Sequence, residues 1–174
     1  ALRRRVAGLD IRTHLARLDP QSPALAAQLL ALAGDRDRPT VILECSDSPG
    51  LKFAVHDACR GLGLPLVIGG VVGWRGQAMA IDPSMNPRAC YRCLFEAPPP
   101  RELAPACAAV GVVGAVAGVL GQQMAALALA LLEGGPEDSP AGTLVDFDLL
   151  AGRVRRLSPA PRPGCGCNQI PRST

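Results

Sequence analysis

Two close pairs of cysteines are the residues whose types and spacing best suit chemistry. The first pair is Cys90 and Cys93 in "CYRC", and the second is Cys165 and Cys167 in "CGC". A C-x-x-C turn lets two thiolates reach one tetrahedral Zn²⁺ at ~2.3 Å, and a structural zinc site needs four ligands. Glycines beside the tighter C-x-C spacer give its backbone the freedom to reach the same ion. The sequence therefore favours a structural zinc clip.

The clip would join segment 88–95 to segment 163–168. The alternatives are a redox or disulfide pair, and no role at all. Thioredoxin-like enzymes place C-x-x-C at a strand-to-helix junction, whereas this one lies in a proline-rich loop. Seven cysteines in a chain without a secretion signal also argue against a disulfide framework.

Asp47 directly follows a short, continuously apolar run, "VILECS", in which a buried parallel strand is expected. Ligands of open α/β sheets bind outside the carboxyl ends of the strands. A carboxylate there can bind Mg²⁺ while bound phosphates supply other ligands. The alternative is that Asp47 or Ser48 only caps the helix that begins near Pro49. Position alone leaves both interpretations open.

Cys107 stands at the start of a long apolar segment, two residues after Pro105. Backbone N–H groups at a helix N-terminus favour a thiolate, so Cys107 is a candidate nucleophile. The alternative is a small apolar core residue, a common use of cysteine. Cys45, in a predicted strand, and Cys59, in a predicted helix, are expected in the core.

The elements that must position these residues follow from periodicity and from glycine and proline signals. We expect strands at 9–16, 39–46, 64–72 and 74–82, the last antiparallel to its predecessor, and two more strands within 142–159. We expect helices at 22–34, 51–63 and 107–135, with 83–106 as a loop. Alternating strands and helices followed by antiparallel strands predict one α/β domain with a mixed sheet, and 174 residues suit a single domain.

The composition narrows the classes of partner. The chain is 48% apolar and 19% charged, and its net charge of +3 is spread along the sequence. Nucleic-acid binding needs basic residues concentrated on one face, so this class is not expected. The chain opens at Ala1 without an initiator Met or a signal peptide, and we expect its natural beginning to lie upstream.

Segment 106–132 is long and apolar enough to raise the question of a membrane span. Gln122 and Gln123 interrupt it, and most of its residues are weakly hydrophobic Ala, Gly and Val. A helix packed on the sheet is favoured, with the glycines of its G-x-x-x-G, Gly114 and Gly118, allowing close approach of the backbones.

Four stretches taken in order resemble the ThiF/MoeB/HesA family, relatives of the ubiquitin-activating enzymes, over roughly residues 1–168. They are "ECSDS", "PLVIGGVVGWRGQAMAIDP", "ACYRCLF" and the long apolar helix through "GTLVDFDLLAGRVRRL" to "GCGC". Members use ATP and Mg²⁺ to adenylate the C-terminal glycine of a ubiquitin-like sulfur carrier. The resemblance implies the C-terminal portion of a Rossmann-like domain with helices on both faces of the sheet.

The resemblance also implies a role for each candidate residue. Asp47 would position Mg²⁺ and the triphosphate, Lys52 would bind cofactor where the family usually has Arg, and Cys107 would bond to the carrier's activated terminus. The implied zinc thiolates are Cys90, Cys93, Cys165 and Cys167. The implied setting is a cytoplasmic homodimer and a carrier ending in Gly-Gly, for sulfur transfer to thiamine, molybdopterin, another cofactor or tRNA.

Three departures from the family pattern bear on function. "SDS" replaces the family's "TDN", and C-x-C replaces its second C-x-x-C. No G-x-G-x-x-G follows a strand, so we expect the glycine-rich half of the ATP site upstream of Ala1 and the chain to be inactive alone. The alternative function is a degenerate, zinc-stabilised module that dimerises or binds a carrier tail without chemistry.

Overall fold

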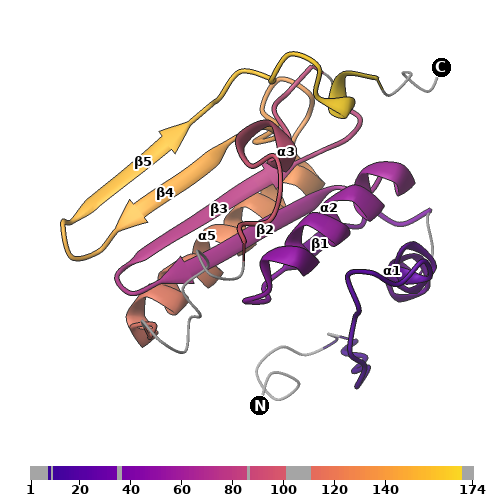
Figure 1. Ribbon diagram of the computed structural model, residues 1–174, viewed down its shortest axis with the longest axis horizontal. Helices are drawn as coiled ribbons and strands as arrows, with labels where there is room; N and C mark the ends of the chain where they lie inside the picture. Colours follow the sequence, from indigo (N-terminus) through magenta and orange to yellow (C-terminus); the bar gives the residue numbers. More distant parts are fainter. Residues whose placement is uncertain (1–7, 9, 35–36, 86, 101–110, 170–174) are drawn as a thin grey trace.

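A five-stranded mixed sheet organises the chain in the computed structural model, which describes residues 8, 10–34, 37–85, 87–100 and 111–169 (Figure 1). The strands lie in chain order: β1 (Ile42–Glu44), β2 (Leu66–Val72), β3 (Arg75–Ile81), β4 (Leu144–Asp148) and β5 (Arg153–Leu157). β1 and β2 are parallel, and every later pair is antiparallel. The predicted antiparallel return of β3 on β2 is confirmed.

Helices cover both faces of this sheet, as expected. α1 (Leu25–Ala33) and α2 (Pro49–Leu62) lie on one face, and α5 (Gly114–Glu133) lies on the other (Figure 1). The short α3 (Tyr91–Leu94) and the 3₁₀ turn η2 (Gly166–Gln169) lie together near the C-terminal end of the described chain. The predicted mixed α/β fold is confirmed.

α2 begins and ends where its sequence signals place it. The Ser48 hydroxyl accepts a hydrogen bond from Leu51 N at 3.3 Å, and Pro49 opens the first turn. Gly63 ends the helix in the left-handed conformation, at φ 69°. The carboxyl end of β1 and the N-terminus of α2 are therefore joined by the short turn that contains Asp47.

Alternation along the strands divides the core into two layers. Met79 and Ile81 of β3 face α2 and the cysteine pairs, whereas Ala78 and Ala80 face α5. Small side chains on the second face leave room for a long helix to lie close to the sheet. Both layers are buried, so the sheet has helix-covered faces on either side over this part of its length.

α5 is, among the described elements, the helix long and apolar enough to cross a membrane. Its Leu120 and Met124 pack on the sheet, which confirms the predicted packing. The predicted role of its glycines is wrong, because Gly114 and Gly118 are exposed and a Cβ on either would meet nothing within 4 Å. The close approach occurs instead at Gly69 of β2, where a Cβ would collide with Met124 and lie 3.2 Å from Leu120 Cδ2.

The strand expected over 9–16 is also wrong. In the described part of that range, residues 10–16 form neither helix nor strand, and Leu15 is fully exposed. Partial alternation of polar and apolar residues predicts a strand only where a neighbouring strand supplies hydrogen bonds and a core buries the apolar side. Neither condition is met at residues 10–16.

Candidate functional site

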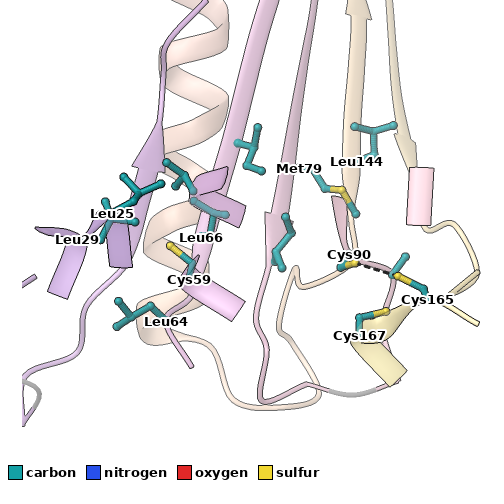
Figure 2. Packing of buried hydrophobic residues seen from close by; sticks show 14 residues of the cluster. Leu25, Leu29, Cys59, Leu64, Leu66, Met79, Cys90, Leu144, Cys165 and Cys167 are labelled. Atoms are coloured by element: carbon teal, nitrogen blue, oxygen red, sulfur yellow. Dashed lines mark hydrogen bonds between the residues drawn. The ribbon is translucent and has the colours of Figure 1, made fainter. Parts of the chain in front are cut away.

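The four cysteines of the two pairs come together in one cluster. Cys90 Sγ lies 3.8 Å from Cys93 Sγ and 3.7 Å from Cys165 Sγ, and Cys93 Sγ lies 3.5 Å from Cys167 Sγ. All four sulfurs lie within 4.8 Å of one another, and Figure 2 shows three of them converging beneath Met79. Four ligands at ~2.3 Å from a tetrahedral Zn²⁺ are about 3.8 Å apart. The cluster therefore fits a metal ion.

Local backbone geometry explains how the two short segments present their thiols. Cys93 N donates to Cys90 O at 2.9 Å, which closes the turn of α3 and brings both sulfurs to one side. In the tail, a left-handed Gly164 precedes Cys165, and the turn η2 brings Cys167 alongside. A Cβ at Gly166 would lie 2.9 Å from Arg60 Nη1, so a larger spacer between the tail thiols would require the Arg60 side chain to move.

Thiol pKa values in the cluster differ with burial and hydrogen bonding. Burial and the neighbouring Cys93 raise the pKa of Cys90 to about 11, and burial also raises the pKa of Cys167 above its usual range. Burial acts the same way on Cys93, but hydrogen bonds from backbone N–H groups outweigh it, and the pKa of Cys93 is about 7. Because zinc binds thiolates, metal binding must displace protons from this cluster.

An ion-pair network anchors the first cysteine pair to α2. Arg92, between the two thiols, donates to both carboxylate oxygens of Asp57 at 2.8 and 2.7 Å and to Glu96 O at 2.7 Å. Its guanidinium also lies 5.0 Å from the centre of the Phe53 ring. Burial would raise the pKa of Asp57, but hydrogen bonds from Arg92 and His56 outweigh it and hold that pKa well below its usual range.

A cavity of 690 Å³ opens on the same face of the sheet, at the carboxyl ends of β1 and β2. Its lining includes Asp47, Lys52, Gly69 and Gly70, together with Tyr91 from the turn that carries the first cysteine pair. A cavity at this edge of an open α/β sheet is where ligands of such folds bind.

Asp47 lies exposed at this cavity. The capping hydroxyl of α2 belongs to Ser48, so the cap of the helix does not account for the Asp47 carboxylate. Ser48 therefore caps α2, and Asp47 lines the cavity.

Lys52 lines the cavity, and its side chain is largely buried. Its ammonium donates to Glu44 Oε2 at 2.5 Å, to Ser46 O at 2.6 Å and to Gly69 O at 2.5 Å. Sequence reasoning missed Glu44, whose side chain is only 4% exposed. A carboxylate at the end of a continuously apolar strand was the available signal, because a buried charge requires a partner.

Of the three remaining cysteines, the structure describes Cys45 and Cys59. Cys59 is buried in the core, as expected. The expectation for Cys45 is wrong: β1 ends at Glu44, and Cys45 is exposed at the cavity, where burial of part of the thiol and the neighbouring Glu44 raise its pKa. Cys107 lies outside the described residues.

Comparison with known proteins identifies the family. The sequence profile of the ThiF family matches residues 1–167. The chain belongs to the ThiF family. Its cysteine cluster and its cavity at the strand ends are therefore features of a ThiF-family chain.

Several curated relatives of this ThiF-family chain have names that state an activity. The adenylyltransferase and sulfurtransferase MOCS3 of Sus scrofa is 38% identical over 156 residues, 88% of this chain and 32% of the relative. The sulfur carrier protein ThiS adenylyltransferase of Escherichia coli (strain K12) is 36% identical over 156 residues, 87% of this chain and 60% of the relative. The chain thus spans about a third to three fifths of the length of these relatives.

Solved structures of Escherichia coli MccB share the fold. The complex with succinimide has a TM-score of 0.57 at 14% identity, over 73% of this chain and 39% of MccB. The complex with ATP has a TM-score of 0.55 at 14% identity, over 73% of this chain and 38% of MccB. At this identity the likeness shows the fold alone.

Proposed function

We propose that this ThiF-family chain takes part in the ATP-dependent adenylation of the C-terminal glycine of a ubiquitin-like sulfur carrier. The observation that carries the proposal is the position of Asp47 in a cavity at the carboxyl ends of β1 and β2. The names of the relatives support the reaction, since both include adenylyltransferase activity and one includes a sulfur carrier.

In this reaction the terminal carboxylate of the carrier attacks the α-phosphate of ATP. A carboxylate-oxygen–phosphorus bond forms, the bond to the bridging oxygen breaks, and pyrophosphate leaves with its electron pair. The product is an acyl-adenylate. The residues of such a site act mainly by positioning the two substrates and by neutralising charge on the phosphates.

We assign Asp47 to binding Mg²⁺, which would neutralise charge on the triphosphate. Lys52 belongs to the same nucleotide site. Cys107 would attack the acyl-adenylate and displace AMP, which leaves the carrier bound to the enzyme through a thioester. Zinc in the cysteine cluster would be structural, because four thiolates leave no open position for a substrate.

We also propose that the protein is a cytoplasmic homodimer whose partner is a carrier ending in Gly-Gly. The outer face of α5 supports a subunit contact, since Leu129 and Leu132 are exposed there beside small residues. Light scattering after size-exclusion chromatography tests the dimer, and a monomer at micromolar concentration would contradict it.

ATP–pyrophosphate exchange, measured with the full-length protein and purified carrier, tests the reaction. Exchange should require the carrier, and Asp47→Asn should lower its rate about a hundredfold, the usual effect of removing one electrostatic group. The matched control is Asp19→Asn, which removes the charge of an aspartate in an exposed turn outside the cavity. Absence of exchange in a folded, zinc-loaded protein would refute the enzyme and favour the carrier-binding module.

Intact-protein mass spectrometry tests the assignment of Cys107. Incubation with ATP and carrier should produce a covalent adduct of the two proteins that Cys107→Ala cannot form. Cys59→Ala, which removes a buried thiol outside the cavity, should still form it. An adduct that survives Cys107→Ala would assign the nucleophile to another residue.

A further inference from the structure

The buried ion pair between Glu44 and Lys52 lies directly beneath the turn that presents Asp47. Glu44 is the last residue of β1 and Lys52 lies near the start of α2, so one residue of the pair precedes the turn and the other follows it. Their side chains are only 4% and 11% exposed. A buried charge pair persists when its remaining hydrogen-bonding groups also have partners.

The partners of this pair are the backbone groups of the turn itself. Glu44 Oε1 accepts from Ser46 N at 2.9 Å, while Lys52 Nζ donates to Ser46 O at 2.6 Å. The backbone N–H of Ser46 is thus hydrogen-bonded to the carboxylate of the pair, and its C=O to the ammonium. One further hydrogen bond runs from Ser48 N to Ser46 Oγ at 3.3 Å. The residues on both sides of Asp47 are therefore bound to one buried structure.

Lys52 also ties the turn to the next strand. Its ammonium donates to Gly69 O in β2, so it connects the carboxyl ends of both parallel strands. Gly69 lies in β2, which pairs with β1 on one side and with β3 on the other, and Met124 of α5 packs directly against it. Lys52 therefore links the turn to β2, a central strand of the sheet.

These contacts use all three donors of the Lys52 ammonium, one each on Glu44, Ser46 and Gly69. A phosphate oxygen could bind Lys52 only in place of one of them, and the carboxylate of Glu44 already neutralises its charge. Lys52 is therefore poorly placed to add net positive charge to the nucleotide site.

We propose that Glu44 and Lys52 are positioning residues, which hold the 45–48 turn so that the Asp47 carboxylate stays in place to bind the divalent cation. This inference rests on the proposed function of Asp47. It adds Glu44 to the site. It also assigns Lys52 the role of holding the turn in place, instead of binding phosphate.

The test compares Glu44→Gln, Lys52→Met, the double variant and Lys52→Arg in the full-length protein. ATP–pyrophosphate exchange is titrated with Mg²⁺, and amide hydrogen exchange is measured on the peptide that covers the turn. Each single variant should raise the Mg²⁺ concentration for half-maximal rate about tenfold, as expected for the loss of a buried hydrogen bond to a charged group. The KM for the carrier should stay unchanged, because Asp47 alone is displaced.

The double variant and the amide exchange separate positioning from direct contact with phosphate. The double variant should be no worse than the poorer single variant, because the two residues act as one unit. Lys52→Arg should recover the wild-type Mg²⁺ requirement to within about threefold, since a guanidinium keeps the positive charge and can still donate to Glu44 and to the backbone carbonyls. The amides of the turn should exchange faster in the single variants and at the wild-type rate in Arg12→Met, which breaks an exposed ion pair elsewhere.

The outcomes that overturn the inference are distinct from those that refute the proposed function. If Lys52→Met loses activity while Glu44→Gln does not, Lys52 contacts phosphate directly and the inference is wrong. If the amides of the turn exchange at the wild-type rate in both single variants, the ion pair does not hold the turn, and the inference is wrong as well. If the wild type shows no exchange activity, adenylation is refuted, and Mn²⁺ binding followed by electron paramagnetic resonance decides the inference. Weaker Mn²⁺ binding in both single variants supports it, and unchanged or absent binding overturns it.

Discussion

The cysteine cluster and the Asp47 turn lie on the same face of one sheet but are stabilised in different ways. The cluster brings together residues 75 positions apart, Cys90 and Cys165, and its four thiols fit a metal ion. The turn is stabilised by a pair only eight positions apart, Glu44 and Lys52, with no need of a metal. A metal can hold distant segments of a small domain together, whereas a buried ion pair shapes a single turn.

The two regions meet at the cavity. Tyr91 follows the first cysteine directly, lines the cavity, and packs edge-on against Phe53 of α2 with ring centres 5.0 Å apart. The cluster therefore determines where one wall of the cavity lies, and the turn determines where the carboxylate lies. Perturbing each region separately should show which property of the cavity depends on it.

Removing a central thiol should have the largest effect. Cys90 is buried and lies near two of the other three sulfurs, so Cys90→Ser should reduce zinc from about one ion per chain to almost none. Because zinc binding contributes to folding, the free energy of unfolding should fall by several kcal/mol. Elemental analysis and thermal unfolding measure both effects. Cys59→Ser, at a buried thiol outside the cluster, should keep its zinc.

Changing the last thiol should have a smaller effect. Cys167→Ser leaves three ligands, and we expect partial zinc occupancy that a chelator removes faster than from the wild type. Competition with a chromogenic chelator measures the difference. Full occupancy with wild-type chelator resistance would show that the tail supplies a different fourth ligand.

These two regions also differ in how far the sequence predicts them. The cysteine cluster was predictable because residue type and short spacing are local properties of "CYRC" and "CGC". The partnership of Glu44 with Lys52 was not, since it depends on how β1, α2 and the carbonyl of Gly69 approach one another. Asp47 was predictable only in part. Its place directly after a strand is a local property of the sequence, but only the structure shows that Ser48, and not Asp47, caps α2.

The wrong predictions have the same physical origin. The G-x-x-x-G of α5 is a local pattern, but the larger Leu120 and Met124 decide which face of the helix meets the sheet. Cys45 was expected in the core because the apolar run continues past Glu44, whereas the strand ends there. The helices and strands packed against a helix or strand decide which of its sides is buried. The periodicity of its own sequence indicates that side only indirectly.

Breaking the ion pair beside the cluster should separate packing from metal binding. Asp57→Ala removes the bidentate partner of Arg92, and the pair is about one-third exposed, so we expect a loss of about 1 kcal/mol. Zinc content should stay at the wild-type level, since the thiols themselves are intact. Denaturant unfolding and elemental analysis on one sample check both expectations. A loss of zinc in Asp57→Ala would show that the network is needed to form the cluster.

The smallest effect is expected at Asp148, at the end of β4 on the open part of the sheet that β4 and β5 form. The backbone N–H of Ala151 and the guanidinium of Arg75 hold the pKa of Asp148 below its usual value. A carboxyl with a lowered pKa in the folded state stabilises the protein above its unfolded pKa, near 4, and this stability is lost as the pH falls through the folded pKa. Asp148→Asn should therefore lower the urea midpoint slightly at pH 7, and the difference from wild type should shrink below about pH 4. Zinc content and Mg²⁺ dependence should not change at pH 7. A change in either would mean that the open part of the sheet is coupled to the cluster or to the turn.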